Sequence, residues 1–114
     1  LIHGDGDQTR DFNYVADVAD FTLRVYETPA TRGRVVNVAS GKEVSVNELV
    51  ARLLAELGVD VPVRHVEPRL GDVRRHQGSV ALGRQLTGFQ PRWTLDDGLA
   101  ETVRWYRKLL APHG

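Results

Sequence analysis

The sequence contains no cysteine, which excludes disulfide bonds, thiol nucleophiles and cysteine-based metal sites. It has no excess of either charge, because 15 Lys and Arg are balanced by 15 Asp and Glu. Proteins that bind nucleic acids or anionic membrane surfaces usually carry a basic excess, so we expect neither partner. No apolar run approaches the roughly 18 residues of a membrane-spanning helix, and no secretory signal is visible. We therefore expect a cytoplasmic protein.

Methionine is absent as well, so the chain lacks an initiator residue. Its first residues, Leu1-Ile2-His3, read as the second half of a β-strand. Both features predict that the 114 residues are a fragment of a longer protein. A chain of this length can form one small domain that buries about two-thirds of its extended surface. The 41% apolar and 26% charged residues are ordinary values for a globular protein.

What is present is an alternation of amphipathic helices and short apolar runs. The strongest helix is expected from Ser45 to Leu57. Ser45 and Glu48 have the spacing of a capping box, and Gly58 suits a C-terminal stop. Apolar residues recur between them at helical spacing. Further helices are expected at residues 17–27 with Asp17 as the N-cap, at 79–86, and at 94–110 with Thr94 as the N-cap.

Short strands are expected at residues 1–3, 12–15, 34–39 and 61–66. The run Arg34–Ala39 is apolar enough to be buried on both faces, as in a parallel sheet. Asn37 would then be a buried polar residue that needs a partner. The resulting order β-β-α-β-α-β-α-α predicts an α/β fold. Because the strands are few and short, they resemble pieces of a sheet that need partners.

The stretch from Gly4 to Val18 reads G-D-G-D-Q-T-R-D-F-N-Y-V-A-D-V and begins as a polar loop with two glycines. Such a loop lets backbone N–H groups approach an anion closely. The guanidinium of Arg10 can donate two parallel hydrogen bonds to a phosphate. The residues alone support two interpretations about equally: a phosphate-binding loop, or a surface turn in which Arg10 pairs with Asp7 or Asp11.

A second candidate cluster is Arg69-Leu70-Gly71-Asp72. A guanidinium for a phosphate and a carboxylate for ribose hydroxyls are chemically matched to a nucleotide diphosphate. Gly71 would allow a close backbone turn between them. This composition is common in loops, so the cluster alone is a weak indication. Arg74, Arg75 and His76 follow as weaker candidates.

The run G-x-G-x-Q-x-R-D-F-x-Y-V-x-D-V resembles the start of the C-terminal part of the extended short-chain dehydrogenase/reductases. The members concerned are the NAD-dependent nucleotide-sugar epimerases and dehydratases, typified by UDP-glucose 4-epimerase. The similarity covers nearly the whole chain in the family's order. It continues through Asn37-Val38, residues 45–49, residues 68–72, residues 88–91, Gly98-Leu99 and Trp105-Tyr106.

The resemblance implies that residues 1–114 are the C-terminal nucleotide-sugar-binding region of such an enzyme. It implies an α/β segment of few short strands and three to four helices, incomplete without the N-terminal Rossmann domain. Arg10 and Arg69 would contact the pyrophosphate of a nucleotide diphosphate sugar, and Asp72 would hold the ribose. The alternative for Arg10 is a structural ion pair with Asp11 or Asp72.

The family's hydride chemistry uses a tyrosine base assisted by a lysine four residues later, and this pair is missing. Tyr14, Tyr26 and Tyr106 are followed at that spacing by valine, alanine and leucine. The motif Gly4-x-Gly6 lacks the third glycine of the dinucleotide fingerprint. We therefore expect no catalytic residue, and we expect NAD to bind the intact enzyme rather than this chain alone. His3, His65 and His113 show no metal-ligand spacing, so we expect no metal-binding residue either.

Two other interpretations stay open. The chain could be a catalytically inactive, stand-alone binding module, which should be compact. It could instead be a truncated remnant without independent activity, stable only as a homo-oligomer that covers its exposed edges.

Overall fold

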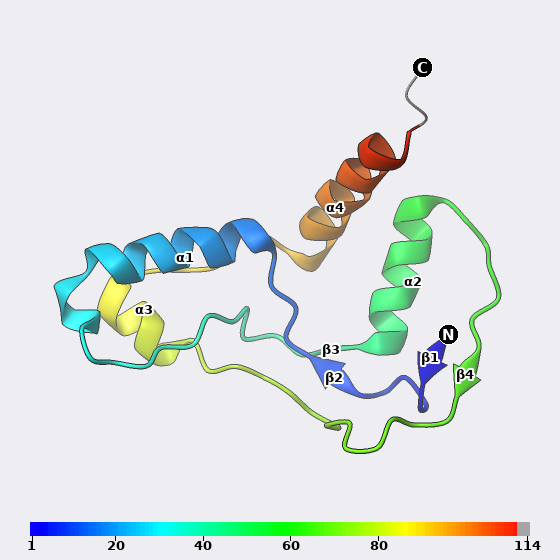
Figure 1. Cartoon of the computed structure of the whole chain (residues 1–114), viewed down its shortest axis with the longest axis horizontal. Helices are drawn as coiled ribbons and strands as arrows, with labels where there is room; N and C mark the ends of the chain where they lie inside the picture. Colours follow the sequence, from blue (N-terminus) through cyan, green and yellow to red (C-terminus); the bar gives the residue numbers. More distant parts are fainter. Residues whose placement is uncertain (112–114) are drawn as a thin grey trace.

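The computed structural model describes residues 1–111, which form four helices and four very short strands (Figure 1). The strands are β1 (Ile2–His3), β2 (Thr9–Arg10), β3 (Val44–Ser45) and β4 (His65–Val66). The helices are α1 (Val15–Glu27), α2 (Val46–Leu57), α3 (Ala81–Thr87) and α4 (Leu95–Leu110), with one 3-10 turn, η1 (Pro29–Thr31). The predicted α/β class with few short strands is confirmed. None of the helices within the described range is long and apolar enough to cross a membrane.

The strands form two separate pairs rather than one sheet. β1 runs parallel to β4, with Ile2 opposite His65. β2 runs antiparallel to β3, with Thr9 opposite Ser45. The pairs fix both ends of the loop that joins β1 to β2. They place this loop between the start of α2 and the connection that follows β4.

Two helices begin at the caps that the sequence predicts. The Ser45 hydroxyl accepts a hydrogen bond from the backbone N–H of Glu48 at 3.0 Å, and Gly58 ends α2 in the left-handed conformation. The Thr94 hydroxyl accepts one from the N–H of Asp97 at 3.2 Å and caps α4. A local cap satisfies donors that have no partner within the helix, so it can be recognised from a few residues.

The start of α1 was predicted incorrectly. No strand forms at residues 12–15; instead, α1 begins at Val15 with Tyr14 as its N-cap. Asp17 is not the cap, because it lies inside the first turn of the helix. It is only 3% exposed, and its carboxylate accepts hydrogen bonds from the backbone N–H groups of Arg92 at 3.1 Å and Trp93 at 3.0 Å. This carboxylate therefore joins α1 to the approach of α4.

The predicted strand at residues 34–39 is also absent. No backbone–backbone hydrogen bond involves residues 35–39 within the described chain. Val35 is 89% exposed, and Asn37 is exposed rather than buried as expected. A strand needs a neighbouring backbone, and residues 1–111 supply none here. The strand expected at 61–66 is shortened to β4, and the short helix expected at 79–86 forms as α3.

The hydrophobic core is small and divided. Phe21 of α1 packs against Phe89 with ring centroids 5.0 Å apart, and α3 lies so close that a Cβ on Gly83 would come within 2.8 Å of the Phe21 ring. On the other side, Tyr14 packs against Trp93 at 4.3 Å and against Gly98 of α4. The buried apolar side chains are Ile2, Phe21, Ala39, Phe89 and Val103.

The molecule is flat and open, with extents of 49 × 43 × 20 Å and a radius of gyration of 17.0 Å. A compact chain of this length has a radius of gyration of about 13 Å. The accessible surface is 8416 Å², whereas a compact monomer of 12.7 kDa exposes about 6,200 Å². Roughly 2,200 Å² therefore stays exposed that a closed domain would bury. Figure 1 shows the reason: α1 and α3 lie at one end and α2 and α4 at the other, joined by long connections.

We predict that Asp17→Ala lowers the free energy of unfolding by about 2 kcal/mol, because two part-buried backbone N–H groups lose a charged acceptor. Urea unfolding followed by circular dichroism would measure the loss. The matched control is Asp60→Ala. Asp60 is exposed and its side chain has no hydrogen bond or ion pair within the described chain, so that substitution should leave stability unchanged. Equal effects of the two substitutions would contradict the role of Asp17.

Candidate functional site

The glycine loop between β1 and β2 is held tightly against the start of α2. Gly4 and Gly6 both have positive φ, at 79° and 78°. A Cβ on Gly6 would lie 2.0 Å from Oδ1 of Asn47, a contact that no side chain could make. Asn47 in turn donates from its amide to the backbone oxygen of Asp5 at 2.9 Å. The glycines thus allow the loop to fold closely around the helix start.

Arg10, the first predicted site residue, is bound to the loop that follows β4. Its Nη1 donates to the backbone oxygens of Thr9 and Val73, both at 2.7 Å. Its Nη2 donates to Oδ1 of Asp72 at 2.5 Å. The structure therefore brings two of the predicted site residues into one ion pair. This pair is one of the two alternatives that the sequence left open for Arg10.

The second oxygen of Asp72 is held by Gln8. The Nε2 of Gln8 donates to the backbone oxygen of His3 at 2.7 Å and to Oδ2 of Asp72 at 3.4 Å. Gln8 is only 9% exposed, so this amide is a buried part of the site. The sequence indicated a loop amide here but not the contact with Asp72. Sixty-four residues separate the two positions, so no local pattern could reveal it.

Arg69, the remaining predicted site residue, is exposed, and within residues 1–111 its side chain has no hydrogen bond or ion pair. It lines a hollow of about 160 Å³ together with Asp72. The rest of the lining is His3, Gly4, Asp5, Gln8, Pro68, Val73 and Arg74. Arg10 reaches Asp72 but is not part of the lining. The hollow thus combines an exposed guanidinium with an anchored carboxylate.

Asp11, another of the predicted partners of Arg10, has a different role. Its carboxylate accepts hydrogen bonds from the backbone N–H and the hydroxyl of Ser40, at 2.8 and 2.6 Å, and from the N–H of Gly41 at 2.9 Å. A longer bond of 3.4 Å comes from the N–H of Gly78. Asp11 therefore ties three separate segments together beside Arg10.

The two arginines that follow the Arg69–Asp72 loop are paired with carboxylates. Arg74 donates to both oxygens of Asp5 at 2.7 and 2.8 Å, which lowers the pKa of Asp5. Arg75 donates to Glu43 at 2.5 and 3.1 Å, and the hydroxyl of Thr9 donates to Glu43 at 2.8 Å. These hydrogen bonds, that from Arg75 first, lower the pKa of Glu43 from 4.5 to about 2.

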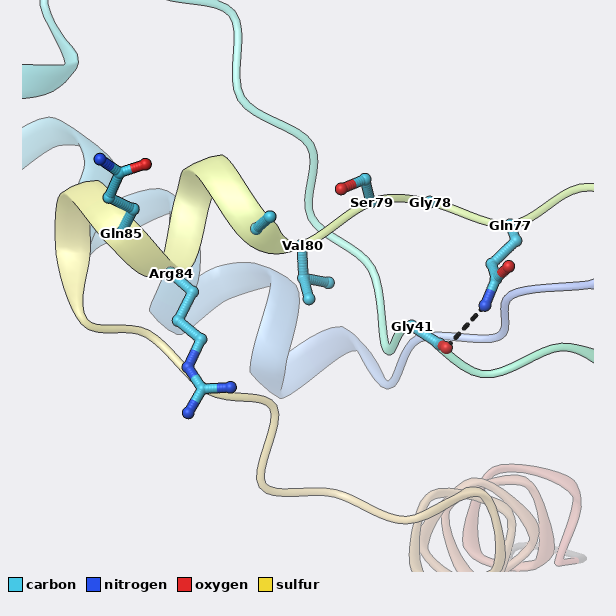
Figure 2. A pocket seen from close by; sticks show the side chains of 8 residues that line it. Gly41, Gln77, Gly78, Ser79, Val80, Arg84 and Gln85 are labelled. Atoms are coloured by element: carbon cyan, nitrogen blue, oxygen red, sulfur yellow. Dashed lines mark hydrogen bonds between the residues drawn. The ribbon is translucent and has the colours of Figure 1, made fainter.

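A second, larger hollow of about 870 Å³ lies beside α3 (Figure 2). It is lined by Gly41, Gln77, Gly78, Ser79, Val80, Ala81, Arg84 and Gln85. Figure 2 shows the amide of Gln77 directed at the backbone oxygen of Gly41, to which it donates at 2.8 Å. The hollow is wide open and contains none of the three predicted site residues, so the smaller hollow is the candidate site.

Comparison with known proteins gives the same family as the motifs. The NAD dependent epimerase/dehydratase family matches residues 1–39. Over 107 residues the chain is 40% identical to the UDP-glucose 4-epimerase of Mycolicibacterium smegmatis, covering 93% of this chain and 34% of that protein. Over 112 residues it is 41% identical to the dTDP-glucose 4,6-dehydratase of Streptomyces griseus, covering 94% and 33% respectively.

Solved structures agree with this result. The UDP-glucose 4-epimerase of Thermotoga maritima, solved with UDP-glucose, matches with a TM-score of 0.91 and 34% identity, covering 96% of this chain and 35% of that one. The UDP-glucuronic acid 4-epimerase of Bacillus cereus, in complex with UDP-glucuronic acid and NAD, matches with a TM-score of 0.88 and 26% identity, covering 95% and 35%.

The resemblance is therefore confirmed: the chain is related to the NAD-dependent nucleotide-sugar epimerases and dehydratases. It spans about a third of the length of the relatives that it matches.

The lowered pKa of Glu43 predicts an acid-dependent stability. Since its folded-state pKa of about 2 lies below the ordinary 4.5, its stabilising contribution is complete above pH 4.5 and is lost as the pH falls towards 2. Glu43→Gln should therefore flatten the decline in the free energy of unfolding across this window, measured by urea titration at several pH values. Glu27→Gln, an exposed glutamate without a side-chain partner in the described part, is the control and should follow the wild type. A Glu43→Gln curve parallel to the wild type would contradict the assignment.

Proposed function

We propose that residues 1–114 form the C-terminal nucleotide-sugar-binding region of an NAD-dependent epimerase/dehydratase and hold the nucleotide diphosphate of the sugar substrate. The observation that supports this proposal most strongly is the contact between two loops that are far apart in the sequence. The glycine loop with Arg10 and the loop with Arg69 and Asp72 are joined through the Arg10–Asp72 pair, whose members are 62 residues apart in the sequence. Relatives that share the fold have been solved with UDP-sugars.

The free hydrogen-bonding capacity of the three residues suits this ligand. Arg69 has no side-chain partner within residues 1–111, so its guanidinium is available to a phosphate. Arg10 uses both Nη1 hydrogens and one on Nη2, which leaves Nε–H and the other Nη2 hydrogen for the second phosphate. Asp72 accepts one bond at each oxygen and keeps further lone pairs for ribose hydroxyls.

Anchoring the nucleotide has a catalytic purpose in such an enzyme. Binding energy at the pyrophosphate and ribose holds the substrate while the sugar reacts elsewhere. In the intact enzyme, NAD would supply hydride transfer. The chain contains neither the dinucleotide fingerprint nor a tyrosine with a lysine four residues later. The residues of the hollow therefore bind and orient the substrate, and the reacting groups belong to another part of the enzyme.

The open shape supports the proposal that another domain of the intact enzyme covers this segment. About 2,200 Å² of excess surface is larger than one side of a standard protein–protein interface. The unpaired backbone of residues 35–39, with Val35 89% exposed, offers an edge that a strand from the N-terminal Rossmann domain would pair with. A free-standing binding module should instead be compact, so the shape favours a segment of a larger enzyme.

Self-association is the competing way to cover exposed surface. Trp105, Tyr106, Leu109 and Leu110 on the last turns of α4 are each more than half exposed. A truncated remnant would bury such residues in a homo-oligomer. Size-exclusion chromatography at several concentrations separates the two interpretations, because only self-association makes the apparent mass rise with concentration.

We predict that the chain binds UDP and that Arg69→Ala weakens this binding roughly 10- to 150-fold, the effect of losing a charge-assisted hydrogen bond. Because the Arg69 side chain is exposed, its removal should not disturb the fold. Isothermal titration calorimetry measures the affinity. Arg84→Ala, which removes another exposed arginine beside the larger hollow, is the control and should leave the affinity unchanged.

Arg10→Ala should weaken UDP binding as well, and it should also loosen the contact with Val73 and Asp72. Equal affinities of the wild type and the Arg69→Ala variant would contradict the proposed contact of Arg69 with the diphosphate. A folded chain that binds no UDP would contradict the proposal that this segment carries a working half-site by itself.

A further inference from the structure

We infer that Gln8 is a positioning residue that sets the orientation of the Asp72 carboxylate and thereby makes the site selective for a ribosyl diphosphate over a bare diphosphate. This inference rests on the proposed function. It adds a residue that acts through Asp72 rather than on the ligand.

Gln8 is fixed from both its backbone and its side chain. Its backbone oxygen accepts from the N–H of Val46 at the start of α2 at 3.1 Å. Its side-chain amide donates to the backbone oxygen of His3 at 2.7 Å and to Oδ2 of Asp72 at 3.4 Å. The residue is 9% exposed. A buried amide held at this many points has little freedom to turn away from the carboxylate.

The contact between Gln8 and Asp72 matters because it occupies the carboxylate oxygen that Arg10 does not bind. An arginine and a carboxylate usually pair through two parallel hydrogen bonds. Here Arg10 donates to Oδ1 alone, through Nη2, and both hydrogens of its Nη1 are used by the backbone oxygens of Thr9 and Val73. Oδ2 is taken by Gln8. Each Asp72 oxygen thus accepts a hydrogen bond from a different residue, and the two bonds together define the plane of the carboxylate.

Without the Gln8 amide, the carboxylate can rotate about its last bond and offer Oδ2 to water. Its remaining lone pairs would then no longer be presented in one orientation to a ligand in the hollow that Gln8, Arg69 and Asp72 line together. The phosphate contacts of Arg69 do not depend on this orientation. Loss of Gln8 should therefore affect the ribose and spare the diphosphate.

The test compares the affinities of UDP, 2′,3′-dideoxyuridine diphosphate and inorganic pyrophosphate by calorimetry. We expect Gln8→Met, of similar length but without a donor, to weaken UDP roughly 5- to 10-fold and to leave pyrophosphate unchanged. The wild-type preference for UDP over the dideoxy compound should disappear in Gln8→Met and equally in Asp72→Asn. The double variant should lose no more than Asp72→Asn alone, since one residue acts through the other.

Retained pyrophosphate binding also shows that the variant is folded. If Gln8→Met loses UDP and pyrophosphate alike, Gln8→Asn is measured in the same way. It keeps an amide but is one carbon shorter, and an equal loss of both ligands there would overturn the inference in favour of a purely structural role. Additive losses in the double variant would overturn it too. A wild-type chain that binds neither UDP nor pyrophosphate would overturn the proposed function itself. Binding of both ligands without any effect of the Gln8 substitutions would overturn only the inference about Gln8.

Discussion

The candidate site depends on the carboxylate of Asp72, which fastens one loop to another. The connection after β4 has almost no secondary structure of its own. It is held against the glycine loop mainly by hydrogen bonds of side chains. Arg10 and Gln8 bind the two oxygens of Asp72 from the glycine loop, and the N–H of Thr9 donates to the backbone oxygen of Arg74 at 2.9 Å. Arg69 is carried on this same connection. Its position beside the glycine loop therefore follows from the Asp72 contacts together with those of Arg10 with Val73 and of Arg74 with Asp5.

Carboxylates also join distant segments elsewhere in the chain, because the strands are too short to hold these segments together. Asp11 gathers the Ser40–Gly41 turn and Gly78, and Asp17 gathers the backbone before α4. Asp11 and Asp17 each accept hydrogen bonds from backbone N–H groups that lie outside the helices and strands. Charged acceptors form stronger hydrogen bonds than neutral ones. A few such contacts can therefore hold together a flat molecule with a divided core.

The predictability of each feature follows from how far apart the interacting residues lie. The caps Ser45 and Thr94 could be read from the sequence because donor and acceptor are three residues apart. Asp17 was misassigned as a cap because its partners lie about 75 residues away. Residues 34–39 have strand composition but no neighbouring backbone in the described chain, and composition cannot supply one. Arg10, Arg69 and Asp72 were identified by motif. The sequence left a pair of Arg10 with Asp11 or with Asp72 open, and the structure selects Asp72 and adds the contact with Gln8.

The Arg10–Asp72 pair is compatible with a ligand-binding role for both residues. Their side chains are 27% and 32% exposed, and ion pairs in such solvated positions contribute little net free energy. The pair can therefore share Arg10 with an incoming phosphate at small cost. It also neutralises Asp72, whose negative charge would otherwise repel a diphosphate arriving beside Arg69. One motif can thus serve the fold and the ligand together, because the contact that joins the two loops also places a guanidinium and a carboxylate where a nucleotide diphosphate needs them.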